Sequence, residues 1–155
     1  MDRVPMTRVG YEALKKEMEH LKTVVRPMNI QAIEEARSHG DLSENAEYHA
    51  AKERQSFIEG RLAELSYKIN AAEVIEPGAT PADRAVVAST VVLENIETDE
   101  SVTYQLVGED ESDIEQGRIS FSSPLGRAII GKRPGDEIVL NAPGGKRVYE
   151  LMELL

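Results

Sequence analysis

The sequence contains no cysteine and no tryptophan, and aromatic residues make up only 5% of its 155 residues. The absence of cysteine excludes disulfide bonds, thiolate metal sites and a cysteine nucleophile. No apolar run approaches the ~20 residues that a membrane-spanning helix needs. The polar start MDRVPMTRVGYE lacks the hydrophobic stretch of a signal peptide. We therefore expect a cytoplasmic protein with no membrane partner.

Positive charge is also scarce. The chain has 18 lysines and arginines against 28 aspartates and glutamates, which gives a net charge of -10. Proteins that bind the phosphate backbone of nucleic acid depend on lysine and arginine. Because this chain is acidic overall, any contact with nucleic acid must be confined to a small part of its surface. With 41% hydrophobic and 30% charged residues, the composition is typical of a globular protein of one domain or two small ones.

Apolar residues in the first half recur at alternating steps of three and four, as they do along one face of a helix. One series comprises Leu14, Met18, Leu21, Val25, Met28 and Ala32, and the other comprises Ile58, Leu62, Leu65, Ile69 and Ala72. Two such seams joined by a short turn predict an antiparallel helical hairpin with arms of about 28 residues, or roughly 40 Å. Pro27 lacks an N–H group and predicts a kink at or just before its position.

The second half changes to short segments rich in valine, isoleucine, leucine and tyrosine, which predict an antiparallel sheet. The expected strands cover residues 86–96, 102–107, 118–121, 137–140 and 147–151. SSPLGRAIIGK predicts a short helix with Ser123 as its cap and Gly131 as its terminator. We expect a two-domain α+β chain with a helical hairpin over 1–76, a linker over 77–82 and a small α+β domain over 83–155.

The bend of the hairpin, RSHGDLSENAEYHAAKE, carries two acidic residues. Asp41 and Glu44 have the spacing of a helix N-cap and its N3 partner, with Gly40 ending the preceding arm. The same carboxylates, exposed at a hydrated tip, are oxygen ligands of the kind that Mg²⁺ prefers, although a strong site would need further ligands from a partner. Both interpretations stay open, because a capping carboxylate can still present one oxygen outward.

Basic residues flank the bend. Arg37 and Lys52 are expected at about the same height behind the tip, and with Arg54 they could touch phosphate, although ordinary solvated helix charges explain them nearly as well. His39 and His49 lie in no recognised metal-binding pattern and are expected to be solvated.

Two long stretches resemble the bacterial Gre transcript cleavage factors, which act on RNA polymerase. HGDLSENAEYHAAKERQSFIEGRL is similar to that family's hairpin-tip signature, and SPLGRAIIGKRPGDEI followed by APGGKRVYELMEL is similar to its C-terminal pattern. YHAAKERQSFIEGRLAEL resembles the GreA branch more than the GreB branch. The resemblance covers essentially the whole chain and implies an N-terminal coiled coil and a C-terminal domain of FKBP-like topology.

The resemblance also implies a function. In that family the globular domain docks at the rim of the secondary channel of RNA polymerase, and the hairpin enters the channel. Asp41 and Glu44 would then help to hold a second catalytic Mg²⁺, shared with the polymerase, and position the attacking water. The factor would not be an enzyme by itself, but would promote cleavage of backtracked RNA and so rescue arrested complexes.

The resemblance assigns supporting roles as well. Asn45 and Tyr48 would support the geometry of the tip, and Arg37 and Lys52 would form a small basic patch near the 3′ end of the nascent RNA. We expect the factor to act as a monomer.

Three alternatives remain. An inhibitor could occupy the same channel without helping the chemistry, although both tip acids and Asn45 disfavour it. A prolyl isomerase or chaperone would need an apolar aromatic pocket, yet Tyr104, Phe121 and Tyr149 are the only aromatic residues of the second half. A freestanding nuclease is disfavoured because two carboxylates alone make no strong metal site.

Overall fold

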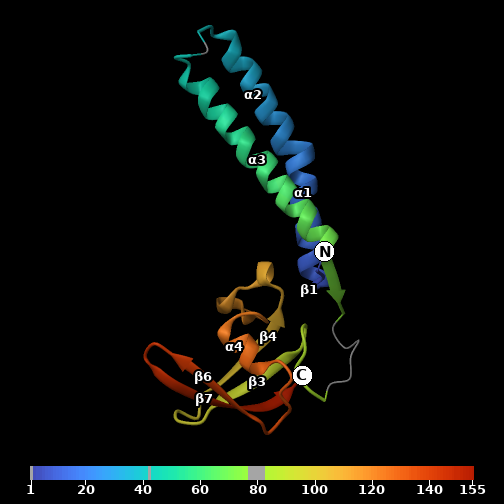
Figure 1. Cartoon of the computed structure of the whole chain (residues 1–155), viewed down its shortest axis with the longest axis vertical. Coiled ribbons are helices and arrows are strands. Elements are labelled where there is room, and N and C mark those ends of the chain that lie inside the picture. The colour runs from blue at the N-terminus through green and yellow to red at the C-terminus, as the bar shows by residue number, and fades with distance from the viewer. Residues whose placement is uncertain (1, 42, 77–82) are drawn as a thin grey trace. The chain divides into compact units, whose positions relative to one another are not determined.

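A computed structural model of the chain describes residues 2–41, 43–76 and 83–155 (Figure 1). It has two compact units, one formed by Glu12–Ala71 and the other by Met1–Tyr11 together with Ala72–Leu155. The first is helical and the second contains a five-stranded sheet, which confirms the predicted α+β class. The predicted linker 77–82 lies outside the described residues. Among the described helices, none has the length and apolar character that a membrane crossing requires.

The helical unit is a hairpin. Its first arm joins helix α1 (Arg8–His20), a π-helical segment (Leu21–Val25) and helix α2 (Arg26–Ser38), and its second arm is helix α3 (Ala46–Ala71). α2 and α3 lie side by side in Figure 1. Leu14, Ile58, Leu62 and Leu65 are buried between the arms, as the seams predict.

The π-helical segment ends one residue before Arg26 and two before Pro27, where the sequence predicts a distortion. Its wider turns take up more residues than α-helical turns do, so the residues that follow change their phase relative to the other arm. Met28, a predicted seam residue, is therefore 66% exposed, whereas Asn29 is only 4% exposed. The prediction of Met28 in the seam is wrong, and Asn29 holds that position.

The second arm ends earlier than the seam predicts. Ala72, expected on the helix, begins strand β2 (Ala72–Ile75), which pairs in parallel with strand β1 (Val4–Thr7). Each strand has four residues, too few for a period of two to stand out in the sequence. This pairing places both strands in the second unit, and the two compact units divide at Tyr11/Glu12 and at Ala71/Ala72. The predicted domain boundary after residue 76 stays a prediction.

The main sheet has the order β5-β4-β3-β7-β6. Its strands are β3 (Thr90–Asn95), β4 (Ser101–Val107), β5 (Arg118–Ser120), β6 (Glu137–Ala142) and β7 (Gly145–Leu154). All neighbours are antiparallel except β4 and β5, which are parallel. The prediction of a wholly antiparallel sheet is therefore wrong at this edge. Two short 3₁₀ turns, Glu109–Glu111 and Ile114–Gln116, carry the chain from the end of β4 back to the start of β5.

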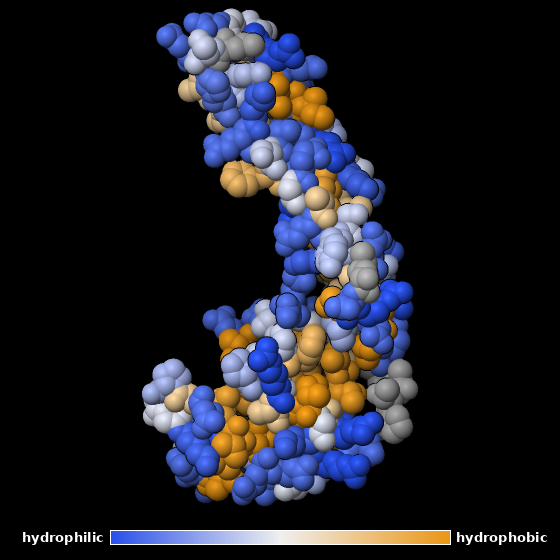
Figure 2. Space-filling model, in the orientation of Figure 1, coloured by the Kyte–Doolittle hydropathy of each residue, from blue (hydrophilic) through white to orange (hydrophobic). Residues whose placement is uncertain are grey.

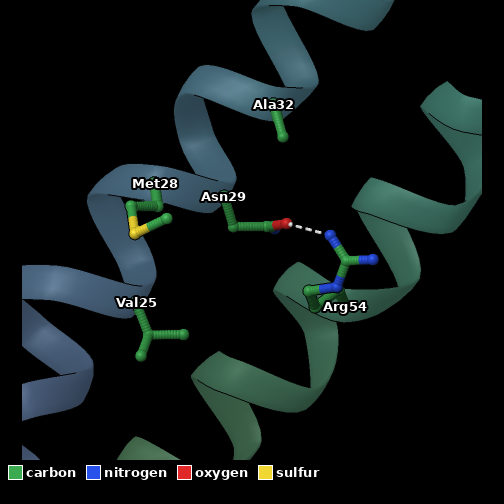
Figure 3. A pocket seen from close by; sticks show the side chains of 5 residues that line it. All are labelled: Val25, Met28, Asn29, Ala32 and Arg54. Carbon is green, nitrogen blue, oxygen red and sulfur yellow. Dashed lines mark hydrogen bonds between the residues drawn. The ribbon is translucent and has the colours of Figure 1, made fainter.

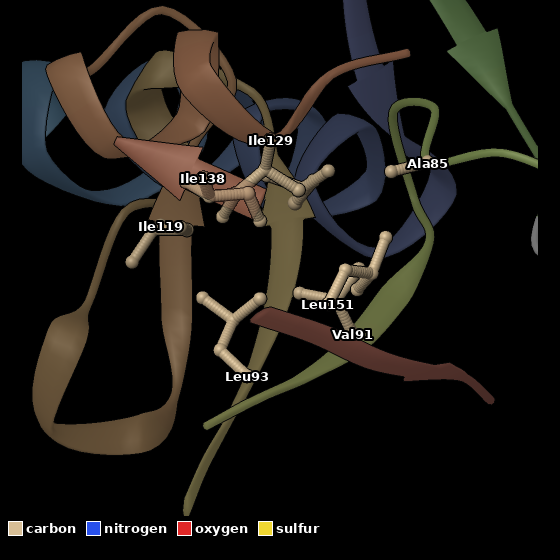
Figure 4. Packing of buried hydrophobic residues seen from close by; sticks show 8 residues of the cluster. Ala85, Val91, Leu93, Ile119, Ile129, Ile138 and Leu151 are labelled. Atoms are coloured by element: carbon tan, nitrogen blue, oxygen red, sulfur yellow. The ribbon is translucent and has the colours of Figure 1, made fainter. Parts of the chain in front are cut away.

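One face of this sheet carries the core (Figure 4). Its fully buried side chains include Val91, Leu93, Leu106, Ile129, Ile138 and Leu151. Helix α4 (Pro124–Ile129) contributes Ile129, and the hydroxyl of Ser123 accepts a hydrogen bond from the Gly126 N–H at 3.1 Å. This confirms the predicted cap. A Cβ on Gly126 would lie 2.0 Å from the Ser120 carbonyl oxygen, so glycine allows α4 to approach β5 closely. The FKBP-like topology stays a prediction.

The first turn of α1 is held by a residue distant in sequence. The Thr7 hydroxyl accepts from the Gly10 N–H at 3.2 Å, as an N-cap does. Glu111 in turn accepts from the Thr7 N–H at 2.9 Å, from the Gly108 N–H at 2.9 Å and from the Thr7 hydroxyl. A Cβ at Gly10 would come within 2.1 Å of the Glu111 carboxyl carbon. Glu111 thus takes the place that an N3 glutamate occupies in a capping box.

Replacing Glu111 with alanine is expected to destabilise the sheet-containing unit by about 1–3 kcal/mol, because the buried Thr7 would keep polar groups without partners. Hydrogen exchange of the Thr7 and Gly108 amides in the full chain measures the loss of protection. Glu115→Ala, at an exposed position of the following 3₁₀ turn, is the matched control. Equal protection in both variants would contradict the assigned role.

An ion pair between the arms makes the hairpin sensitive to acid. Arg61 donates two hydrogen bonds to the Glu17 carboxylate, at 2.5 and 2.8 Å, and these bonds lower the pKa of Glu17 below its ordinary value of 4.5. A lowered pKa in the folded state stabilises the fold above the unfolded pKa and loses that contribution as the pH falls through the folded value. The side chains are 36% and 40% exposed, so the contribution is at most about 1 kcal/mol.

We therefore expect the unfolding free energy of the hairpin to fall below a pH of about 4.5, and to fall less steeply in Glu17→Gln. Urea denaturation followed by helical circular dichroism between pH 6 and 3 measures the difference between the two proteins. Glu19→Gln, an exposed neighbour on α1, should retain the wild-type pH dependence.

Candidate functional site at the hairpin tip

The first arm ends in a glycine turn. α2 stops at Ser38, and the N–H groups of His39 and Gly40 donate to the carbonyls of Ala36 and Arg37 at 3.2 and 3.3 Å. Gly40 has a φ of +93°, a conformation that glycine adopts without strain. The predicted role of Gly40 as the residue that ends this arm is confirmed.

The second arm begins with Asn45 rather than with Asp41. The Asn45 Oδ1 atom accepts from the Tyr48 N–H at 3.0 Å, as an N-cap does for a helix that begins at Ala46. Its Nδ2 group donates to the Ala36 carbonyl of the other arm at 2.6 Å. An amide can accept and donate at once, whereas a carboxylate only accepts. The prediction that Asp41 and Glu44 form the cap and its N3 partner is therefore wrong.

The two acids lie in the loop between the arms. The Asp41 Oδ1 atom accepts from the Ser43 N–H at 3.2 Å and from the Ser43 hydroxyl at 2.8 Å, which is an Asx turn. Its Oδ2 atom accepts no hydrogen bond from the described residues. Glu44 is exposed and forms neither a hydrogen bond nor an ion pair within the described part of the chain. Neither carboxylate therefore forms an ion pair with a described residue, although Asp41 has a structural role in the Asx turn.

The donor set suits a hard cation but is incomplete. Over the described residues, no group of three or more histidine, cysteine or acidic side chains is arranged to hold a metal ion. Two carboxylates in a hydrated loop are ligands of the kind that Mg²⁺ takes, and Mg²⁺ often completes its octahedron with waters and phosphate oxygens. The tip can therefore contribute to a magnesium site that another molecule completes.

The basic residues lie at different heights and turn to different partners. Arg37 is the last residue but one of α2, and Lys52 is the seventh residue of α3. Lys52 is thus about five residues, or roughly 8 Å, farther from the tip. The expectation that Arg37 and Lys52 lie at equal distances behind the tip is wrong, because the loop between the arms is centred nearer Asp41 than Glu44. Lys52 lies 5.5 Å above the ring of Tyr48, whereas Arg54 donates to Asn29 at 3.2 Å.

Two histidines tie the loop together, which the sequence did not indicate. His39 lies 3.3 Å from the Glu47 carboxylate, and the His49 Nε2 atom lies 3.3 Å from the Ser43 carbonyl oxygen. The sequence did contain a signal for Asn45 as the N-cap of the second arm, because asparagine is among the best N-cap residues and stands directly before the helical pattern.

Comparison with known proteins identifies the class. Residues 4–74 match the family model "Transcription elongation factor, N-terminal", and residues 80–155 match "Transcription elongation factor, GreA/GreB, C-term". The chain therefore belongs to the GreA/GreB family of transcription elongation factors.

Within this family the chain is similar to proteins named transcription elongation factor GreA. The protein from Neisseria meningitidis serogroup A is 56% identical over 99% of this chain and 98% of its own, and that from Halorhodospira halophila is 55% identical over the same shares. Solved structures similar to this chain include GreA/GreB from Nitrosomonas europaea, with 22% sequence identity over 98% of both chains and a TM-score of 0.44. They also include Gfh1 from Thermus thermophilus, with 27% identity over 99% of both chains and a TM-score of 0.45. With these low scores, the assignment rests on the sequence matches.

Proposed function

We propose that this protein is a transcript cleavage factor. It binds RNA polymerase, inserts the hairpin into the secondary channel and stimulates the polymerase's own cleavage of backtracked RNA. The observation that carries the proposal is the pair Asp41 and Glu44 at the end of a long arm. Neither carboxylate forms an ion pair within the described residues, and one oxygen of Asp41 accepts no hydrogen bond from them. Helix α3 of this arm has 26 residues, or roughly 39 Å. Such an arm can carry two carboxylates deep into a larger molecule.

Each acid has a distinct part in this proposal. Ser43 holds one oxygen of Asp41, so the other oxygen is directed by a fixed Asx turn. Glu44 has no such restraint and can adjust to the site it enters. Together they would share a Mg²⁺ ion with the polymerase, and such an ion activates water and stabilises the displaced oxygen in phosphodiester hydrolysis. The carboxylates can also accept a hydrogen bond from the attacking water and so orient it.

The other tip residues support this arrangement. Asn45 joins the two arms through its hydrogen bond to the Ala36 carbonyl. The Tyr48 N–H donates a hydrogen bond to Asn45, and the Tyr48 ring lies beneath the Lys52 ammonium group. Lys52 and the exposed Arg37 would contact the 3′ end of the backtracked RNA as a small, salt-sensitive patch. The sheet-containing unit would dock at the rim of the channel. In this proposal the factor works as a monomer in the cytoplasm.

A halted elongation complex tests the proposal. Addition of the protein with Mg²⁺ to a backtracked complex carrying 3′-labelled RNA is expected to release a short 3′ fragment and restore extension. Slowing of the complex without fragment release would indicate a channel-binding inhibitor instead. Because the described residues of the tip provide no complete ligand set for a metal ion, the protein alone should leave naked RNA intact, and cleavage of naked RNA would identify a nuclease.

A further inference from the structure

One side of the hairpin exposes large apolar residues. Phe57 is 71% exposed and Met28 is 66% exposed, whereas side chains of these types usually lie in the interior. Met28 and Arg54 line a hollow of about 330 Å³ together with Val25, Ala32 and the buried Asn29 (Figure 3). Phe57 stands three residues after Arg54 on α3 and so faces the same side. We call Val25, Met28, Ala32, Arg54 and Phe57 the Phe57 surface.

The positive charge of Arg54 is not paired with a carboxylate of the described residues. Arg26 pairs with Glu59 at 2.9 Å, and Arg61 pairs with Glu17 and Glu64. Arg54 differs, since it donates to the neutral amide of Asn29 and forms no ion pair with a carboxylate of the described residues. A guanidinium beside an apolar hollow is suited to an apolar surface that also carries a carboxylate.

Asn29 holds this arginine in place. Its Nδ2 group donates to the Ala51 carbonyl and to the Gln55 Oε1 atom, both at 2.9 Å, and its Oδ1 atom accepts from Arg54. The amide is therefore anchored to the other arm, and Arg54 is positioned before any partner arrives. Pre-positioned side chains lose less conformational entropy on binding.

The surface lies on the part of the arm that the proposed function sends into the polymerase. Phe57 is the twelfth residue of α3, so it stands roughly 17 Å behind the start of that helix. Hydrophilic residues dominate the side of the hairpin seen in Figure 2, and hydrophobic ones gather in small separate patches. A local apolar contact there is compatible with an arm that is otherwise surrounded by water.

We propose that the Phe57 surface is a second contact with RNA polymerase, where an apolar segment of the channel wall covers Phe57 and Met28 and a carboxylate of that segment pairs with Arg54. The proposal rests on the proposed function, because it takes the polymerase as the partner. In this proposal the Phe57 surface contributes to the affinity for the polymerase, whereas the tip acids contribute to the cleavage reaction.

The test measures affinity and cleavage separately with the full chain. Phe57→Ser is expected to raise the Kd for the halted complex about tenfold, in the range seen for a central aromatic contact, while the cleavage rate at saturating factor stays within twofold of wild type. Arg54→Gln should raise the Kd severalfold, and Arg54→Lys by less. Ile30→Ser is the matched control, because Ile30 is also exposed, at 45%, but lies roughly 200° from Met28 around the helix.

The outcomes are distinct. An unchanged Kd for Phe57→Ser, with wild-type binding and cleavage intact, would overturn this inference and leave the proposed function standing. Absence of wild-type binding to the polymerase would overturn both. A benzophenone side chain at position 57 should cross-link to polymerase, and one at Ser56 should do so far less. Concentration-dependent dimers of the free protein that Phe57→Ser abolishes would show that a second copy covers the surface, and would overturn the assignment to polymerase.

Discussion

Cleavage of backtracked RNA is expected to fall at least about 100-fold when Asp41→Asn and Glu44→Gln are combined, a loss of roughly 2.7 kcal/mol of transition-state stabilisation. The amides retain the size of the acids, and Asn at position 41 can still accept the Ser43 hydrogen bonds. They remove the negative charge that would attract a divalent cation. Single-turnover cleavage at saturating factor measures the loss, and a competition assay should give a Kd within twofold of wild type.

A matched variant separates this effect from the loss of two negative charges on the hairpin. Glu34→Gln combined with Glu53→Gln removes the same charge from exposed helix positions away from the tip, and it should cleave at the wild-type rate. Each single tip variant should also need more Mg²⁺ for half-maximal rate. Wild-type cleavage by the double tip variant would refute the metal role of the acids while leaving the family assignment in place.

Asn45→Ala is expected to have the second largest effect, because it removes both the α3 cap and the bond between the arms. The cap contributes about 0.5–2 kcal/mol, and the bond to Ala36 contributes about a further 0.5–1.5 kcal/mol. The loop that holds both acids would lose its fixed end. We therefore expect a hairpin destabilised by about 1–3.5 kcal/mol and a cleavage rate that falls about tenfold at saturation.

Asn45→Asp distinguishes the two bonds. Aspartate retains the acceptor for the Tyr48 N–H but has no N–H group to donate to the Ala36 carbonyl. If the bond between the arms positions the tip, Asn45→Asp should have near-wild-type helix content and still cleave slowly. Urea denaturation and single-turnover cleavage, measured on the same preparations, decide this. Full cleavage by Asn45→Asp would show that the cap alone suffices.

Short-range patterns in the sequence were sufficient to predict much of the secondary structure and of the helix packing. The 3–4 spacing through Ile58, Leu62 and Leu65 predicts a helix face, and all three residues are buried. Ser123 before Pro124 predicts the start of α4, and Gly40 predicts the end of α2. These features depend on neighbours within about one helical turn, so the printed sequence contains nearly all of the relevant information.

The errors arose where distant segments meet. Met28 was expected in the seam, but the π-helical segment before it moves Asn29 into that place. Strands β1 and β2 exist because two four-residue segments, 68 positions apart, pair with one another. Glu111 completes the cap of α1 from a different part of the chain. None of these partners can be identified from local periodicity.

The candidate site shows both what local sequence patterns predict and what they miss. The sequence by itself determined which residues stand at the bend, that two of them are acids, and that a long arm carries them. Only the tertiary structure decided that Asn45 caps α3 and bonds to Ala36, so that capping does not require Asp41 or Glu44. The physical reason is that helix periodicity and capping propensity act over a few residues, whereas the partner of a side-chain amide depends on how the two arms align in space.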